Sequence, residues 1–122
     1  RFGWAAARLD DVLNLPGSRL TATLAVVLGE NPAAAWRAWR RDAAAHPSPN
    51  AGPVEAAFAG SLGVRLGGTN MYGARTEHRA VMGDGCSPDR ADLARARRLA
   101  RRVGLGAVLV AAVAAVARAE RP

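Results

Sequence analysis

The stretch from His46 to Tyr72, HPSPNAGPVEAAFAGSLGVRLGGTNMY, restricts the backbone more than any other part of the chain. Its first two prolines fix φ and remove two N–H donors, so the residues around them adopt extended or turn geometry. Pro53 fits the first turn of a helix that Asn50 or Gly52 would open. We therefore expect a polar turn followed by a helix, with Glu55 close to the positive end of the helix dipole.

Small residues four apart are a second property of this stretch. Ala56 and Gly60 form one such pair, and Gly63 and Gly67 form another. This spacing lets two helix backbones approach closely, chiefly in membranes. One interpretation is a packed helical hairpin without chemistry, because function must be argued from a site and not from a fold. The other is a polar active-site loop held by packed helices, and four side chains favour it: His46, Asn50, Glu55 and Asn70.

The charge of the chain calls for an anionic partner. The formal net charge is +7, and all 17 basic residues are arginine. Nucleic acid, an anionic membrane surface or a phosphorylated ligand would each balance this charge. We expect no nucleic-acid partner, because only 5% of the residues are aromatic and no nucleic-acid-binding module is recognisable. Cys86 is the single cysteine, which excludes an internal disulfide and a cysteine-based zinc site.

The N-terminal segment has a helical pattern that a breaker interrupts. Apolar residues recur at helical spacing over residues 1–15, and Pro16 to Ser18 should end that helix. Asp10 and Asp11 lie off the apolar stripe, either as a solvated face with local ion pairs or as a contact for Mg²⁺. Residues 20–29 are almost wholly apolar, but a bilayer span takes about 20 residues. A buried core helix, a re-entrant hairpin and a span that borrows its neighbours all remain open.

A second helix should run from Asn31, as cap, and Pro32, at the first position, to about Ala45. Trp36 and Trp39 share one face of it, surrounded by arginines. Tryptophan beside arginine is typical of a membrane interface. Ordinary core tryptophans beside a solvated arginine face are the alternative.

Residues 73–85 (GARTEHRAVMGDG) are polar and rich in glycine, so we expect a loop. Asp84 lies between two glycines and is either an ordinary turn residue or a ligand for Mg²⁺ or phosphate. His46 and His78 are isolated in sequence, and neither has the spacing of a zinc pair.

The last expected element is a basic helix that becomes apolar. Ser87, Pro88 and Asp89 form a helix start, and the helix then passes through an arginine cluster. The apolar run from Val103 to Ala117 would measure roughly 22 Å as a helix, against about 30 Å for the hydrocarbon core. Snorkelling arginines could close this gap, and a buried soluble helix is the competing view. We favour the membrane, with the basic cluster and the central stretch on the cytoplasmic side.

Three segments, in order, carry a resemblance to a known family. They are RFGWAAARLDDVLNLPGSRLTA, HPSPNAGPVEAAFAGSLGVRLGGTNMYG and a GDG before the terminal apolar helix. Together they closely resemble the C-terminal part of the CobD/CbiB family, membrane-bound enzymes of cobalamin biosynthesis. The resemblance implies a mainly α-helical integral-membrane protein fragment with a polar, Gly/Pro-rich active-site loop region, and a missing N-terminal part of the same protein. We divide the chain into residues 1–30 (a helix and a short apolar segment), 31–86 (the polar motif region) and 87–122 (the terminal helix).

The same resemblance implies adenosylcobinamide(-phosphate) synthase activity. In this reaction (R)-1-amino-2-propanol, or its O-phosphate, is joined through an amide to a propionate carboxylate of adenosylcobyric acid. ATP and Mg²⁺ are the implied cofactors. The implied location is the cell membrane, with several passes through the lipid bilayer.

Candidate site residues follow when this chemistry is matched to the motifs. Phosphoryl transfer needs positioning and charge neutralisation, Mg²⁺ prefers carboxylate oxygens, and arginine binds phosphate through its fork. The expected catalytic residues are His46, as the base for the amine, Asn50, Glu55 and Asp84. The expected substrate or phosphate ligands are Arg8, Ser48, Arg65, Asn70, Tyr72 and Arg75, and the expected metal ligands are Asp10, Asp11, Glu55 and Asp84.

Two other functions compete with the enzyme. In a non-catalytic membrane module, the glycine motif would only pack helices and the arginines would hold anionic lipid. A soluble basic nucleic-acid binder would instead show salt-sensitive binding to DNA. Without the resemblance, the residues favour the membrane module.

Overall fold

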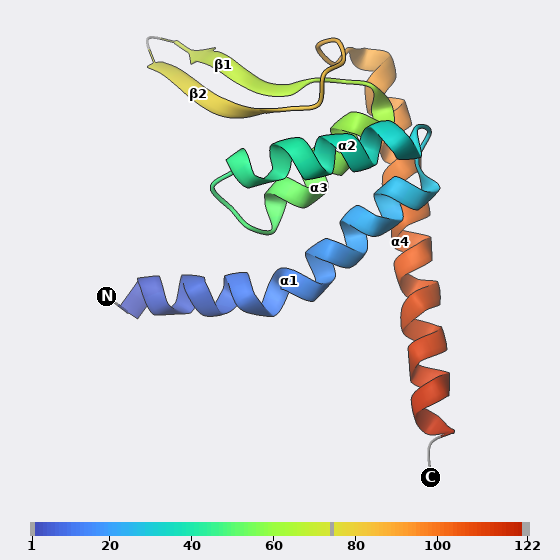
Figure 1. Cartoon of the computed structure of the whole chain (residues 1–122). Helices are drawn as coiled ribbons and strands as arrows, with labels where there is room; N and C mark the ends of the chain where they lie inside the picture. Colours follow the sequence, from blue (N-terminus) through green and yellow to red (C-terminus); the bar gives the residue numbers. More distant parts are fainter. Residues whose placement is uncertain (1, 74, 121–122) are drawn as a thin grey trace.

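The chain is mainly helical, with a single two-stranded antiparallel hairpin in the described residues (Figure 1). The computed structural model describes residues 2–73 and 75–120, and it leaves out the side chains of Phe2, Asn70, Tyr72 and Arg75. The elements are α1 (Phe2–Leu28), α2 (Pro32–Asp42), the 3₁₀ turn η1 (Ala43–Ala45), α3 (Ala51–Leu62), β1 (Leu66–Tyr72), β2 (Arg75–Met82) and α4 (Arg90–Ala119). The expectation of a mainly α fold is confirmed.

Helix α1 continues through the predicted breaker, so the expectation that it ends at Pro16 was wrong. A proline inside a helix removes one backbone hydrogen bond and bends the axis, but it does not have to end the helix. Figure 1 shows α1 changing direction about halfway along its length. Residues 20–28 therefore form the second half of α1, where the buried Ala22 and Ala25 join the core against α3 and α4.

Helices α2 and α3 pack with their backbones in close contact. The start of α2 is as expected, because the Asn31 side chain accepts the N–H of Ala34 at 3.0 Å and Pro32 follows it. The small-residue pair of α3 is buried, and a Cβ on Gly60 would lie only 2.5 Å from the carbonyl oxygen of Ala34. The second small pair does not belong to a helix, since Gly63 ends α3 with a φ of 65°.

Residues 73–85 are not simply a loop. Strands β1 and β2 form a hairpin in which Thr69 pairs with His78 and Asn70 pairs with Glu77, with a bulge near Leu66. The hairpin projects beyond α2 and α3 in Figure 1. Only its base is held by the core, where Met82 is buried and Leu66 and Ala80 are partly buried. The polar outer part satisfies its backbone across the strands, which the glycine-rich sequence pattern does not reveal.

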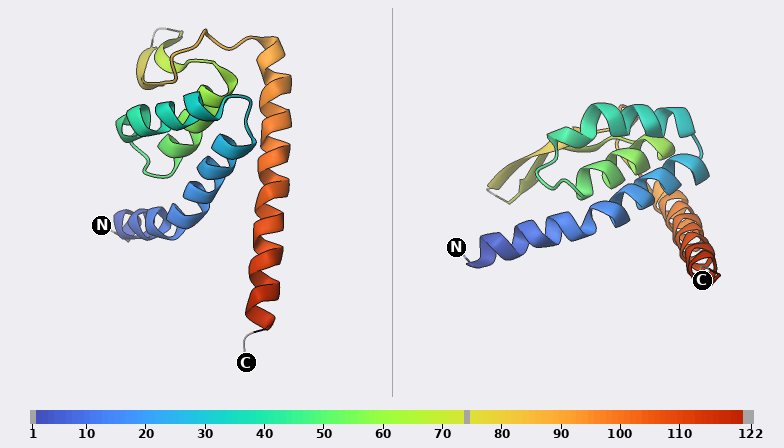
Figure 2. Two further views of the ribbon diagram at one scale, coloured as in Figure 1. Left: turned by 45° about the vertical axis from the view of Figure 1, so that its right-hand side comes forward. Right: turned by 60° about the horizontal axis from the view of Figure 1, so that its bottom comes forward.

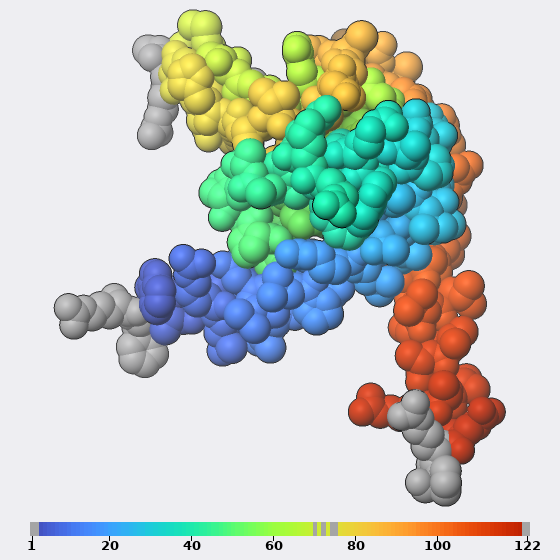
Figure 3. Space-filling view, viewed as in Figure 1, coloured from blue at the N-terminus to red at the C-terminus, as the bar shows by residue number. Residues whose placement is uncertain are grey.

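Helix α4 begins two residues later than expected and runs without a break for 30 residues. Asp89, not Ser87, is the cap: its side chain accepts the N–H groups of Ala91 and Asp92, and Asp92 completes a capping box. Leu99 and Val103 are buried, whereas the apolar residues beyond them are exposed. Figures 2 and 3 show this second half of α4 extending away from the other elements.

Among the described residues, α4 is the one helix that is long and apolar enough to cross a membrane. Its 30 residues correspond to about 45 Å, more than the hydrocarbon core requires. An integral-membrane location with several passes stays a prediction.

Candidate functional site

Two cavities meet at the segment His46–Pro47, which contributes to the walls of both. The first, about 620 Å³, contains three arginines and two tryptophans, and we name it the arginine cavity. It is lined by Arg8, Arg19, Trp36, Trp39, Arg40, Ala43, Ala44, His46, Pro47, Pro49 and Pro53. The second, about 600 Å³, contains two histidines and two glutamates, and we name it the His–Glu cavity. It is lined by Ala45, His46, Pro47, Glu55, Leu66, Gly67, Glu77, His78, Arg79 and Ala80.

The turn between α2 and α3 determines how His46 is oriented. After η1 the backbone becomes extended at His46, and the backbone N–H of Ser48 donates to its Nδ1 at 3.0 Å. The neutral imidazole therefore carries its proton on Nε2. Ser48 in turn accepts the N–H groups of Asn50 and Ala51 through its hydroxyl, at 3.3 and 3.2 Å, which holds the turn.

His46 and Glu55 are the two expected catalytic residues that the structure brings together. Nε2 of His46 lies 3.7 Å from Oε1 of Glu55, within the distance of an ion pair. Glu55 projects from the first turns of α3, as expected, and its side chain is about half exposed to the His–Glu cavity. An imidazole N–H that faces a carboxylate orients it and supports its negative charge.

Asn50 uses its side chain to connect the turn to α1. Its Oδ1 accepts the Ser18 hydroxyl at 2.9 Å, and its Nδ2 donates to the carbonyl oxygen of Asp11 at 2.9 Å. It lies at the N-terminus of α3 without a side-chain capping bond. The structure therefore gives Asn50 a positioning role, with both polar atoms already occupied by the protein.

Asp84 lies apart from Glu55 and lines neither cavity. Arg41 donates to Asp84 at 3.0 Å and also forms two hydrogen bonds with Asp42. The Arg41 guanidinium holds the pKa of the Asp84 carboxyl below its usual range. The structure does not combine the expected catalytic residues Asn50, Glu55 and Asp84 in one cleft.

The expected metal ligands are also dispersed. Asp10 accepts a hydrogen bond from Asn14, and Asp11 lies 4.0 Å from Arg8, on the exposed side of α1. Within residues 2–73 and 75–120, no three His, Cys, Asp or Glu side chains come together in a way that could hold a metal.

The expected phosphate ligands separate into two places. Arg8 lines the arginine cavity, with Ser48 in the adjoining turn, whereas Arg65 is exposed beyond α3 and lines neither cavity. The side chains of Asn70, Tyr72 and Arg75 lie outside the described residues.

The sequence reasoning did not assign several residues that the structure places in the cavities. Arg19, Trp36, Trp39 and Arg40 belong to the arginine cavity, and Glu77 and His78 belong to the His–Glu cavity. The tryptophan–arginine face of α2 was a visible signal, but a membrane interface explained it equally well. No local signal indicated that a hairpin brings Glu77 opposite Glu55.

The fold and the site define a mainly helical protein in which a polar, cavity-bearing region lies beside one helix able to cross a membrane. Residues 1–100 match the model of the protein family described as CobD/Cbib protein. The chain belongs to this family.

Curated relatives agree with the family match. The cobalamin biosynthesis protein CobD of Mycobacterium tuberculosis (strain ATCC 25618 / H37Rv) is 59% identical over 115 residues, which are 91% of this chain and 37% of that protein. The proteins of the same name from Chromobacterium violaceum and Rhodobacter capsulatus are 50% and 44% identical, over 83% and 94% of this chain and 32% and 37% of their own lengths. The chain thus spans about a third of the length of these relatives, and no solved structure matches it significantly.

Proposed function

We propose that the chain is part of an enzyme of cobalamin biosynthesis that forms an amide between adenosylcobyric acid and (R)-1-amino-2-propanol or its O-phosphate. Membership of the CobD/Cbib family and the name shared by the relatives support the pathway. The resemblance supports the particular reaction, with ATP and Mg²⁺ as cofactors. In such a reaction ATP supplies the phosphoryl group that activates the carboxylate, and Mg²⁺ neutralises phosphate charge. We assign no residue to Mg²⁺, because no three His, Cys, Asp or Glu side chains cluster among the described residues.

The observation that carries the proposal is the His46–Glu55 pair, which lies where the two cavities adjoin. A primary amine is protonated near neutral pH and must lose a proton before or during attack on an activated carboxyl group. In the His–Glu cavity, Glu77 is paired with Arg79, and the Glu55 carboxylate can attract an ammonium group. The arginine cavity has the charge that attracts an anionic reactant. The proposed reaction requires one reactant of each kind.

Within this pair, we assign the base to Glu55 and a positioning role to His46. The neutral His46 ring has Nδ1 occupied by the Ser48 N–H and a proton already on Nε2, so it has no free lone pair for the amine. Glu55 has a carboxylate oxygen that faces the cavity and accepts the proton as the C–N bond forms and phosphate leaves. The sequence analysis expected His46 to be the base; here the base is Glu55, and His46 positions it.

The test is to replace Glu55 by Gln in the complete protein and to measure amide formation from adenosylcobyric acid, aminopropanol phosphate and MgATP. We expect a fall in kcat of about 100-fold or more, because general-base catalysis contributes 10²–10⁴-fold. The His46→Gln variant should lose less and should shift the pH profile of the remaining activity. Glu120→Gln, at the far end of α4, is the matched control and should keep full activity. Full activity in Glu55→Gln would contradict the assignment.

A non-catalytic membrane module is the second candidate, because the close packing at Gly60 and the exposed apolar half of α4 are what such a module needs. The two functions differ in one assay. Only the enzyme should hydrolyse ATP in a manner that depends on cobyric acid.

A further inference from the structure

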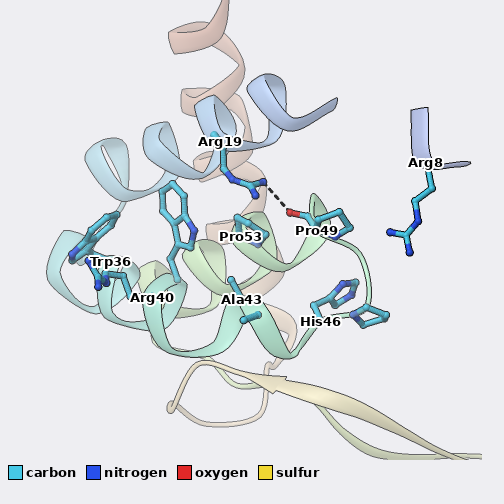
Figure 4. Close-up of a pocket in the computed structure, with 11 residues that line it drawn as sticks. Arg8, Arg19, Trp36, Arg40, Ala43, His46, Pro49 and Pro53 are labelled. Atoms are coloured by element: carbon cyan, nitrogen blue, oxygen red, sulfur yellow. Dashed lines mark hydrogen bonds between the residues drawn. The ribbon is translucent and has the colours of Figure 1, made fainter. Parts of the chain in front are cut away.

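The arginine cavity has a strongly unbalanced charge. Arg8, Arg19 and Arg40 line it, and no carboxylate belongs to the lining that the structure describes. Figure 4 shows Arg40 and Arg8 at opposite sides of the view, with Arg19 between them and bonded to Pro49. Trp36 and Trp39 complete the wall, with ring centroids 5.4 Å apart in an edge-to-face arrangement.

Two of these guanidinium groups are held in position without being neutralised. Arg19 is half-buried, and its Nη1 donates to the Ser18 hydroxyl at 2.8 Å and to the Pro49 carbonyl oxygen at 2.9 Å. Neither acceptor is an anion, so Arg19 keeps its full charge. The guanidinium carbon of Arg40 lies 5.7 Å from the centre of the Trp36 ring, and Arg40 has no carboxylate partner in the described part of the chain.

The neighbouring arginine shows that this lack of partners is a local property. Arg41 follows directly in the sequence, but it does not line the arginine cavity and pairs with both Asp42 and Asp84. Two carboxylates therefore neutralise Arg41, whereas Arg40, the preceding residue, presents unneutralised charge to the arginine cavity. Arg8 lies 4.0 Å from Asp11, but Arg19 and Arg40 have no carboxylate at ion-pair distance within the described part of the chain. Two such positive charges in the wall of a concave site indicate an anionic ligand.

We propose that the arginine cavity binds the phosphate groups of a nucleoside phosphate. Arginine forks match phosphate oxygens, and an exposed tryptophan ring provides a surface on which a base can stack. The volume of about 620 Å³ lies within the range of small-molecule sites. The inference that the cavity binds an anion rests on its charges alone. The inference that this anion is a nucleoside phosphate rests on the proposed function. Of the expected phosphate ligands, Arg8 lines this cavity and Arg65 does not.

The experiment measures binding of MgATP, inorganic pyrophosphate and adenosine to the complete protein in neutral detergent, by equilibrium dialysis and tryptophan fluorescence. Arg40→Gln removes charge from the cavity. Arg37→Gln removes the same charge from the same helix, and Arg37 does not line the arginine cavity; it borders a shallow surface depression together with Trp36, Arg40 and Arg41. We expect the dissociation constants of MgATP and pyrophosphate to rise about tenfold or more in Arg40→Gln and to change less than twofold in Arg37→Gln. Adenosine alone should quench the fluorescence weakly and equally in both variants.

Other results would overturn the proposal. Equal weakening in the two variants, together with competition by vesicles of anionic lipid, would mean that the arginines of α2 form a surface for lipid phosphates. Unchanged binding in Arg40→Gln, or no binding by the unmodified protein, would remove the site. These outcomes are separate from the proposed function: amide formation that survives unchanged in Arg40→Gln removes only this cavity assignment, and phosphate binding without any amide formation removes only the reaction.

Discussion

At the scale of single residues, Asp42 joins two distant parts of the chain. Its carboxylate accepts two hydrogen bonds from Arg41, at 2.6 and 2.9 Å, and the backbone N–H of Gly83 at 2.8 Å. The end of α2 is thereby connected to the return of the hairpin. The Arg41 guanidinium lowers the pKa of Asp42 most, and the Gly83 N–H lowers it further against the opposing effect of burial. A carboxylate with only about a tenth of its side chain exposed must stay charged for these bonds to persist.

We predict that Asp42→Ala lowers the free energy of unfolding by about 1–3 kcal/mol at pH 7, because it leaves the Gly83 N–H without its acceptor and leaves Arg41 with Asp84 alone. Since the pKa is lowered on folding, the contribution of Asp42 is complete above the ordinary carboxyl pKa of 3.8 and is lost as the pH falls through the lower folded value. Denaturation followed by tryptophan fluorescence in detergent should show the two proteins converging in stability at acid pH. Asp10→Ala, on the exposed side of α1, is the control and should change stability little. Equal stability of Asp42→Ala and the unmodified protein at pH 7 would contradict this prediction.

At the scale of elements, the contact between α2 and α3 positions the site. His46 and Glu55 can face each other only because the two helices lie close enough for the connecting turn to be short. That closeness depends on Gly60, whose Cα faces the backbone of Ala34 and Ala35. Small residues at a helix crossing allow packing that any larger side chain would prevent.

Gly60→Ala should therefore destabilise the fold by about 1–3 kcal/mol, since the added methyl group meets backbone atoms that have no rotamer to change. A Cβ there would lie 2.8 Å from both the carbonyl carbon of Ala34 and the Cα of Ala35. Gly17→Ala is the matched control, because nothing lies within 4 Å of its Cβ position in α1. Thermal unfolding monitored by circular dichroism distinguishes the two. An equal melting temperature for both variants would show that α2 and α3 can separate without cost.

At the scale of the whole molecule, polar and apolar parts are separated along α4. The hairpin and the arginine-rich first half of α4 lie at one end, and the apolar half of α4 extends from the other (Figure 2). Leu105 and Val108 are 72% and 67% exposed, which water does not favour but lipid does. If α4 crosses the bilayer, the positive-inside rule places both cavities in the cytoplasm.

The single cysteine of the chain can report this orientation. Cys86 is exposed and lies between the hairpin and α4, on the side of the cavities. We predict that a membrane-impermeant maleimide modifies Cys86 in inside-out vesicles and not in right-side-out vesicles. Cys86→Ser identifies the signal that belongs to this residue, and detergent permeabilisation should restore labelling in both preparations. Labelling from the outside alone would reverse the topology.

Much of the local structure could be read from neighbouring residues. The Asn31–Pro32 start of α2, the burial of Ala56 and Gly60 and the position of Glu55 near the start of α3 each depend on interactions within one or two helical turns. The family membership was also visible in the sequence, because its long irregular motif is specific. Capping, φ restriction and side-chain size act over a few residues, and a sequence shows such effects directly.

Only the tertiary structure decided how these pieces combine. Pro16 continues a helix whose second half is held by packing on α3 and α4, and residues 75–82 form a strand because β1 pairs with them. Which helix faces lie together determines three features of the site. His46 pairs with Glu55, Asp84 pairs with Arg41, and the charge of Arg40 is not neutralised. Such contacts join residues far apart in the chain, and their free energies depend on burial and distance in the folded state, which no local pattern records.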